Sequence, residues 1–244
     1  MGVTLAAGPP GKSPERSAQV VEIAGPAGAG KTTLFEALSR ASPNIRAVAS
    51  LRTMSYLASF AATALASTPL HLRRYARHSL GWRERMIMIH AGALHHMVPR
   101  TSQARLTLFD QGPVFMLTRL YGSGVERIED ERVRRWWAAM ITRWASTVDK
   151  VIRLDAPDAV LVQRIRVREK WHVTKEKSEQ DTYEFLRSFR RACDATLSRL
   201  GCLTGPRLVE FDTSTLSVNE IAEQLLPELS GGRAAHRGSP SAHA

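Results

Sequence analysis

The chain has 244 residues, of which 43% are hydrophobic and 23% charged, with 16 glycines and 12 prolines. This composition excludes wholesale disorder, a collagen-like repeat and a small disulfide-built scaffold, and it supplies a sizeable core. Lys and Arg number 34 against 23 Asp and Glu, which gives a formal net charge of +11. We therefore expect an anionic partner; nucleic acid, a membrane surface and phosphorylated small molecules all agree with this sign.

Two features bear on the compartment. The only cysteines, Cys193 and Cys202, form neither a CxxC pair nor a zinc site, and the first 17 residues lack the apolar core of an export signal. Residues 53–72 carry no formal charge over the length of a membrane span, but Ala, Ser and Thr dominate them. We therefore expect a cytoplasmic protein with reduced thiols, and a buried Ala-rich helix instead of a stable membrane insertion.

Both ends of the chain, residues 1–18 and 229–244, are predicted to be disordered tails around one domain, residues 19–228. Within the domain, apolar runs of strand length alternate with longer helical patterns, which indicates a parallel sheet covered on both faces. A three-layer α/β fold with a five-stranded parallel sheet follows. The predicted strands are Val20–Ala24, Ile45–Ala49, Arg105–Asp110, Lys150–Leu154 and Leu208–Phe211.

Apolar residues at helical spacing predict the helices between and after these strands. They are Lys31–Ala41, Thr53–Ser67, Leu70–Ser79, Arg83–Met97, Glu126–Ser146, Asp158–Lys170, Glu179–Leu200 and Val218–Leu226, with a further helix starting near Val114. Residues 52–99 thus form a helical insert between the second and third strands. Tryptophans in Glu126–Ser146 are predicted to be core, and Ser217 with Glu220 forms a capping box.

The strongest motif directly follows the first predicted strand and precedes a helix. It runs Gly25, Pro26, Ala27, Gly28, Ala29, Gly30, Lys31, Thr32 and Thr33. This Gly-x4-Gly-Lys-Thr spacing between a strand and a helix is a complete Walker A motif, or P-loop. All nine residues are therefore predicted to bind the phosphates of a nucleoside triphosphate.

Each part of this loop has a chemical reason. Glycines allow successive backbone N–H groups to point at one anion, and the helix that follows adds its partial positive charge. Lys31 is expected to reach the β- and γ-phosphates. The hydroxyl of Thr32 is expected to ligate the magnesium that bridges them, and Thr33 to face the α-phosphate.

A carboxylate follows the third predicted strand. Asp110 ends the run Arg105–Asp110, and parallel topology places it beside the phosphate loop at the carboxyl edge of the sheet. It is predicted to ligate magnesium, and also to orient or deprotonate an acceptor hydroxyl. The alternative is a helix cap for the segment that starts near Val114.

The chain lacks the additional motifs that GTPases, transporter ATPases and helicases carry besides a P-loop. A GTPase needs a DxxG switch and an Asn-Lys-x-Asp guanine reader, and neither occurs. A transporter ATPase or a helicase needs further coupling motifs and usually more residues. These classes are therefore disfavoured.

The segment Leu154-Asp155-Ala-Pro157 followed by Arg164 and Arg168 resembles the P-loop nucleoside and nucleotide kinases, of the thymidylate kinase and deoxynucleoside kinase type. The resemblance covers roughly residues 19–228 and implies a lid over the phosphates at about 164–180. A helix would put both arginines on one face, where they would clamp the transferred phosphoryl group. A solvated basic helix face is the alternative. The turn Asp212–Ser214 is similar to the one that borders the adenine in those kinases.

The chain departs from both branches where the acceptor binds. Thymidylate kinases carry an Asp-Arg pair where this chain has Asp110 and Gln111, and deoxynucleoside kinases carry a Glu where this chain continues with Ser50-Leu51-Arg52. Arg52 either replaces a lost phosphate contact or caps the sheet edge. Arg83 belongs to clusters of cations and aromatics that either line an acceptor site or form a solvated helix face.

A possible metal pair remains in the insert. His90, His95 and His96 share one predicted helix, but no acidic residue stands between them, so we expect a surface role instead of metal binding.

Together these patterns predict a kinase that uses ATP and Mg²⁺ to phosphorylate a nucleoside, nucleotide or similar small molecule. Its predicted catalytic residues are Lys31, Asp110, Arg164 and Arg168; its metal ligands are Thr32 and Asp110; its acceptor-binding residues are Arg52 and Arg83. The acceptor is expected to be anionic, and nucleic acid is not expected to bind. The first alternative is an ATP-binding NTPase whose basic insert docks nucleic acid or another polyanion. A second is a membrane-peripheral protein that uses residues 53–72.

Overall fold

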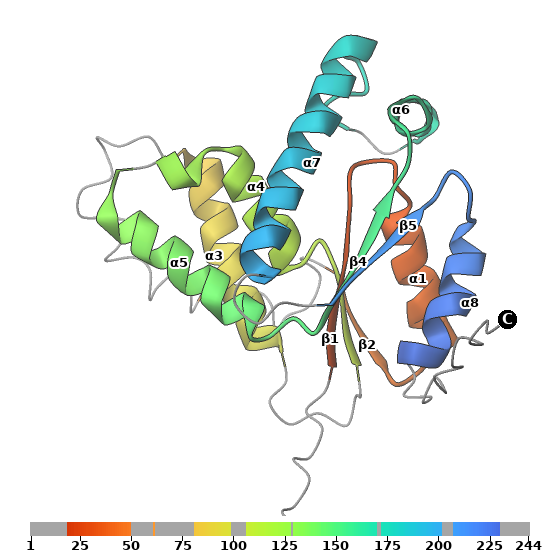
Figure 1. Ribbon diagram of the computed structural model, residues 1–244, viewed down its shortest axis with the longest axis horizontal. Helices are drawn as coiled ribbons and strands as arrows, with labels where there is room; N and C mark the ends of the chain where they lie inside the picture. The colour runs from red at the N-terminus through yellow and green to blue at the C-terminus, as the bar shows by residue number, and fades with distance from the viewer. Residues whose placement is uncertain are drawn as a thin grey trace, which may run out of the picture.

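The computed structural model describes residues 19–49, 61, 81–98, 106–127, 129–169, 172–201 and 207–229. Five parallel strands form one sheet in the order β2-β3-β1-β4-β5 (Figure 1). They are β1 (Gln19–Ala24), β2 (Ile45–Ala49), β3 (Leu106–Asp110), β4 (Lys150–Asp155) and β5 (Arg207–Asp212). Every predicted strand is confirmed to within one residue at each end, and so is the α/β fold class.

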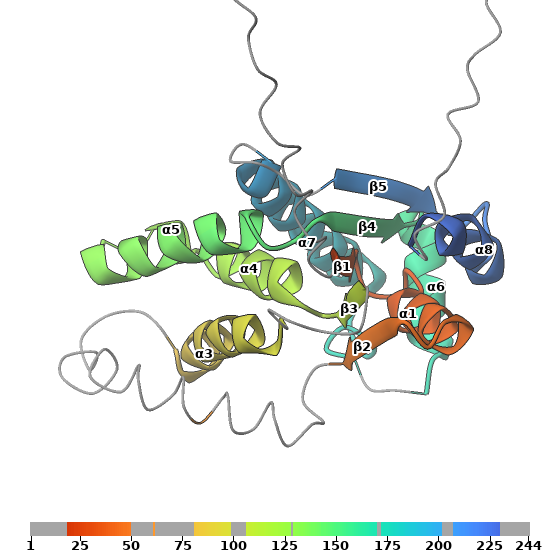
Figure 2. The ribbon, with the colours of Figure 1, turned by 90° about the horizontal axis from the view of Figure 1, so that it is seen from below.

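Helices cover both faces of the sheet, so the molecule has three layers (Figures 1 and 2). One face carries α1 (Lys31–Ala41) and α8 (Val218–Leu229), with α6 (Asp158–Val167) near them at the carboxyl edge. The other face carries α3 (Trp82–Met97), α4 (Pro113–Gly122), η2 (Val125–Arg127), α5 (Glu131–Ala145) and α7 (Glu179–Gly201).

The central strand β1 separates two hydrophobic cores because its side chains alternate between the two faces. Val21 and Ile23 belong to the core on the α1 and α8 face. Val20 and Ala24 belong to the core on the opposite face, which also contains the fully buried Trp144 of α5. The tryptophans of α5 are thus confirmed as core residues, since Trp137 and Trp144 are buried and Trp136 packs against them.

Two predicted helices end earlier or start later than their apolar spacing indicates. The prediction Glu126–Ser146 is wrong at its start, because Asp130 accepts a hydrogen bond from the backbone N–H of Arg132 at 2.8 Å and so begins α5 at Glu131. The prediction Asp158–Lys170 is wrong at its end, because α6 stops at Val167 and Arg168 has extended backbone angles of −69° and 142°.

The last helix starts as predicted but is longer. Ser217 and Glu220 form the capping box, with the Ser217 N–H donating to Glu220 at 2.7 Å and the Glu220 N–H donating to the Ser217 hydroxyl at 3.3 Å. α8 continues to Leu229, one residue into the segment assigned to the tail.

Other predictions fall outside the described residues. These are the tails at 1–18 and 230–244 and the insert helices Thr53–Ser67 and Leu70–Ser79, of which residue 61 alone is described. Among the helices that the structure does describe, none combines the length and apolar character needed to cross a membrane.

Candidate active site

The phosphate loop follows β1, and its glycines have the backbone angles expected of a P-loop. Gly25, Gly28 and Gly30 have φ values of 136°, 83° and 85°, which side-chain-bearing residues rarely adopt. A Cβ on Gly25 would stand 2.0 Å from the backbone oxygen of Leu154. Glycine is therefore required here both by the turn and by the close approach of β4.

Lys31 lies across this loop at the start of α1. Its Nζ donates a hydrogen bond to the backbone oxygen of Pro26 at 2.6 Å. Burial lowers the pKa of Lys31 to about 8, and the nearby Asp110 acts in the opposite direction. Lys31 is thus a desolvated cation, which strengthens its attraction to an anion in the loop.

Thr32 and Asp110 meet as predicted. The Thr32 hydroxyl donates to Oδ2 of Asp110 at 3.1 Å, and the parallel pairing of β1 with β3 brings the two elements together. A hydroxyl and a carboxylate fit magnesium, which takes few protein oxygens and completes its shell with phosphate and water. Within the residues that are described, no cluster of three or more His, Cys, Asp or Glu could hold a metal by itself.

Asp110 does not cap the helix that follows it, so that alternative is wrong. Glu22 of β1 instead accepts hydrogen bonds from the first N–H groups of α4, from Val114 at 2.7 Å and from Phe115 at 2.8 Å. Glu22 is fully buried, and desolvation raises its pKa to about 8. Glu22 was not predicted from the sequence, although a lone acid inside an apolar strand is a visible signal.

The turn between Asp110 and α4 is strained. Gln111 has a φ of 57°, the one positive φ at a non-glycine residue among the described residues. Gly112 next to it has no room for a side chain, since a Cβ would lie 2.6 Å from Cβ of Phe109 and 3.0 Å from the Glu22 carboxyl carbon. Strain of this kind is typical of functional turns, and the hydrogen bonds that Glu22 accepts from the start of α4 support this one.

Arg164 and Arg168 are placed differently from the prediction. Arg164 of α6 donates to the Thr213 hydroxyl and to the Thr213 backbone oxygen, both at 2.8 Å. Arg168 follows the end of α6, so the two do not form a pair on one helix face; its backbone oxygen accepts from Lys175 at 2.5 Å. Both arginines nevertheless line the same cavity as Lys31.

A polar network that the sequence analysis missed supports Arg164. Arg190 of α7 donates to Oδ2 of Asp155 at 2.8 Å and to Oδ1 at 2.9 Å, and it also pairs with Asp158. The backbone oxygen of Asp155 accepts from the Thr213 N–H at 2.8 Å and from its hydroxyl at 3.1 Å. Arg190 is thus connected to Arg164 through Asp155 and Thr213.

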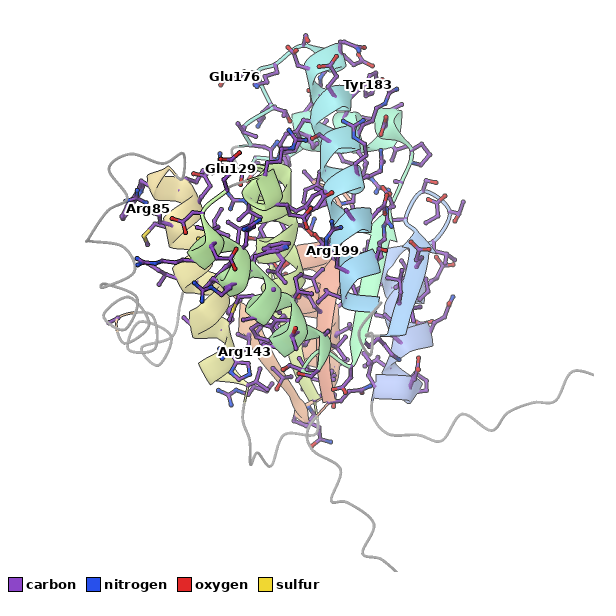
Figure 3. The ribbon with its side chains drawn as sticks, turned by 60° about the vertical axis from the view of Figure 1, so that its left-hand side comes forward. Arg85, Glu129, Arg143, Glu176, Tyr183 and Arg199 are labelled. Carbon is purple, nitrogen blue, oxygen red and sulfur yellow. The ribbon has the colours of Figure 1, made fainter. Side chains whose placement is uncertain are left out.

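Two cavities adjoin the phosphate loop. The larger, of about 800 Å³, is lined by residues of the loop, α3, α4 and α7, and it includes Thr32, Arg83, Gln111 and Arg168. The smaller, of about 300 Å³, lies between Gly28, Thr33, Arg164 and the turn at Thr213. Figure 3 labels Arg85 of α3, Glu176 before α7 and Tyr183 of α7 in the upper half of the helical layer.

The two arginines predicted to bind the acceptor have different outcomes. Arg83 is exposed and lines the larger cavity, whereas Arg52 lies outside the described residues.

The surface role expected for His90 is wrong, because His90 is buried, and burial lowers its pKa to about 4. His95 packs edge-on against Trp144 at 5.5 Å between ring centroids. Cys193 is buried, and its burial raises the thiol pKa to about 11, as for an unreactive thiol.

The strand order and the loop after β1 define the fold. A 2-3-1-4-5 parallel sheet with a P-loop between β1 and α1 is the fold of P-loop kinases. No protein-family model and no curated protein sequence matches the chain.

A solved structure agrees with this fold. Shikimate kinase from Bacteroides thetaiotaomicron superposes with a TM-score of 0.51 at 13% identity, covering 87% of this chain and 98% of that one. The YorR protein from Bacillus subtilis, solved in complex with phosphorylated GDP, has a TM-score of 0.49 at 17% identity, covering 87% and 96%. At 13% identity the likeness to shikimate kinase shows the fold alone. The finer resemblance to thymidylate and deoxynucleoside kinases stays a prediction.

Proposed function

We propose that this protein is a P-loop phosphotransferase that uses ATP and Mg²⁺ to phosphorylate a small molecule. One observation carries the proposal: the phosphate loop, with Lys31 and the Thr32–Asp110 pair, adjoins a cavity of about 800 Å³ that residues of α3, α4 and α7 also line. A cavity of this size accommodates a small acceptor next to a bound triphosphate.

The residues at the loop then have separate tasks. The backbone from Gly25 to Thr33 binds the phosphates, and Lys31 stays in contact with the γ-phosphoryl group during its transfer. Thr32 and Asp110 would hold the magnesium, which supplies charge neutralisation between the β- and γ-phosphates when bound. Asp110 is also proposed to orient or deprotonate the acceptor hydroxyl.

The arginines at the end of α6 are proposed to act on the donor. Arg164 and Arg168 line the cavity next to Lys31 and would offset the charge that develops on the phosphoryl group. The smaller cavity, between Arg164 and the Thr213 turn, is proposed to hold the nucleoside of the donor. Catalysis would then consist of positioning and electrostatic stabilisation.

Calorimetry and a transfer assay test this proposal. We expect the purified chain to bind MgATP and Lys31→Ala to lose that binding. A panel of nucleosides, nucleotides, sugars and sugar phosphates, followed by ³¹P NMR, should then yield a phosphorylated product. Absence of nucleotide binding would overturn the proposal. ATP hydrolysis that is stimulated by DNA or RNA and lost at high salt, without any phosphorylated product, would favour a nucleic-acid-associated NTPase instead.

A further inference from the structure

The larger cavity contains a second group of cations besides those at the phosphate loop. Arg119 of α4 is half-buried, Arg83 of α3 is exposed, and both line the cavity. Arg119 stands six residues into α4, about 9 Å along its axis from Pro113. Arg119 is the one cation in the sequence of α4, and it lines the cavity. Gln111, which directly follows Asp110, also lines the cavity but is uncharged.

The charge of these two arginines is poorly balanced. Burial and the neighbouring Arg83 lower the pKa of Arg119, and Glu84 acts in the opposite direction. Within the part of the chain that the structure describes, neither guanidinium has a carboxylate within the 4.0 Å of a salt bridge. Two guanidinium groups that line one cavity and have no carboxylate within salt-bridge distance among the described residues form a favourable site for an added anion.

Aromatic rings adjoin Arg119. Its guanidinium carbon lies 5.8 Å from the ring centroid of Phe115 on the same helix. Phe115 in turn lies 6.1 Å from Phe189 of α7, at an interplanar angle of 42°. Both phenylalanines are half-buried and line the cavity, so they offer an apolar surface next to the cations.

We infer that the acceptor is itself an anion, a phosphomonoester or a carboxylate on a flat or apolar body. Arg119, assisted by Arg83, binds the anionic group, and Phe115 with Phe189 contacts the body. This inference rests on the proposed phosphotransferase function. The cations beside the loop, Lys31, Arg164 and Arg168, remain available to the donor phosphates. Arg119 and Arg83, which come from α4 and α3, serve the second anion.

Binding of simple probes tests the inference without knowledge of the natural acceptor. The phosphate loop is first saturated with Mg²⁺ and a non-hydrolysable ATP analogue, so that the probes cannot occupy it. Benzyl phosphate, phenylacetate and benzyl alcohol are then titrated and followed by NMR. We expect one or both anions to bind more tightly than the alcohol, and their order distinguishes phosphate from carboxylate recognition. Equal binding of benzyl alcohol and the anions would overturn the inference.

Substitutions locate the site. Arg119→Met keeps the apolar stem on Phe115 and removes the charge, so we expect the affinity for the preferred anion to fall about 10- to 100-fold. Arg119→Lys should recover part of the loss. The matched control is Arg199→Met, at a residue that Figure 3 labels on α7. Arg199 also packs over a ring of α4, at 4.9 Å from Tyr121, but is not among the residues that line the cavity.

Two further results separate this inference from the proposed function. Binding of the ATP analogue should be unchanged in Arg119→Met, whereas Lys31→Ala should lose it. Normal nucleotide binding combined with full anion affinity in Arg119→Met overturns this inference alone. If Arg119→Met does not fold, Arg83→Met replaces it, because Arg83 is exposed in the first turn of α3. A smaller loss of anion affinity is expected there, and no loss would count against the site.

Discussion

The two ends of the large cavity are built in different ways. The loop end consists of consecutive residues, Gly25 to Thr33, whose backbone angles and first helical turn form the phosphate nest. The helical end collects Arg83, Arg119 and Phe189 from three helices that are far apart in the sequence. A triphosphate is the same in every donor, so backbone groups suffice to bind it, whereas an acceptor is recognised by side chains that differ between enzymes.

A supporting layer connects the two ends. Glu22 holds the turn that carries Asp110 and Gln111, and Arg190 of α7 connects through Asp155 to the turn that holds Arg164. The two ends therefore differ in the residues that would contact ligands, which are consecutive at the loop end and come from separate helices at the other. The supporting residues behind them, Glu22 and Arg190, connect elements of both ends.

The largest effect is expected at the loop end. Lys31→Ala should reduce phosphoryl transfer by about 100- to 1,000-fold, because a positioned charge on the transferred group is lost. The thermal midpoint should stay close to that of Lys177→Ala, a control on an exposed lysine before α7. In the wild type, MgATP affinity should fall as the pH rises through about 8, where Lys31 loses its proton. An unchanged turnover in Lys31→Ala would contradict the assignment of the loop.

Asp110 tests the boundary between the two ends. Asp110→Asn should lower kcat by about 100-fold and affect MgATP affinity less, because the amide is a poor magnesium ligand and cannot take a proton. Steady-state kinetics and calorimetry on the same preparation measure both quantities. Equal, small losses in both would remove Asp110 from the chemical step.

Arg190 tests whether the ends share support. Arg190→Met should lower the free energy of unfolding by about 2 kcal/mol, because Asp155 loses charged hydrogen bonds that are largely shielded from water. It should also weaken MgATP binding through Thr213 and Arg164. Arg187→Met is the matched control on the same helix, since Arg187 is exposed and forms an ion pair with Asp158 at 3.4 Å; about 0.5 kcal/mol or less is expected there. Urea unfolding compares them, and equal losses would contradict the connection.

At Glu22 we expect a change in the pH dependence of stability. Its pKa is raised from 4.5 to about 8, so the folded protein holds a proton that the unfolded chain releases between these values. Stability should therefore fall as the pH rises from 4.5 to 8, by at most about 1.4 kcal/mol per pH unit from this group. Glu22→Gln should flatten that slope, whereas Glu223→Gln on the exposed face of α8 should keep it. A slope that Glu22→Gln leaves unchanged would contradict the raised pKa.

The predictable part of the site was local in the sequence. The phosphate loop and the pairing of Thr32 with Asp110 followed from a short motif and from parallel topology. Arg168 was misplaced because apolar spacing did not show that α6 ends at Val167. His90 was taken for a surface residue because periodicity does not show that a helix is enclosed on more than one side.

The amino-acid sequence by itself determined the strands, the layer architecture and the phosphate loop, since each depends on periodicity or on neighbouring residues. Only the tertiary structure decided that Glu22 caps α4, that Arg190 is connected to Arg164, and that Arg119 faces the same cavity as Lys31. These relations join residues that are between 26 and 93 positions apart. The packing of helices on the sheet sets such distances, and no local pattern in the chain encodes them.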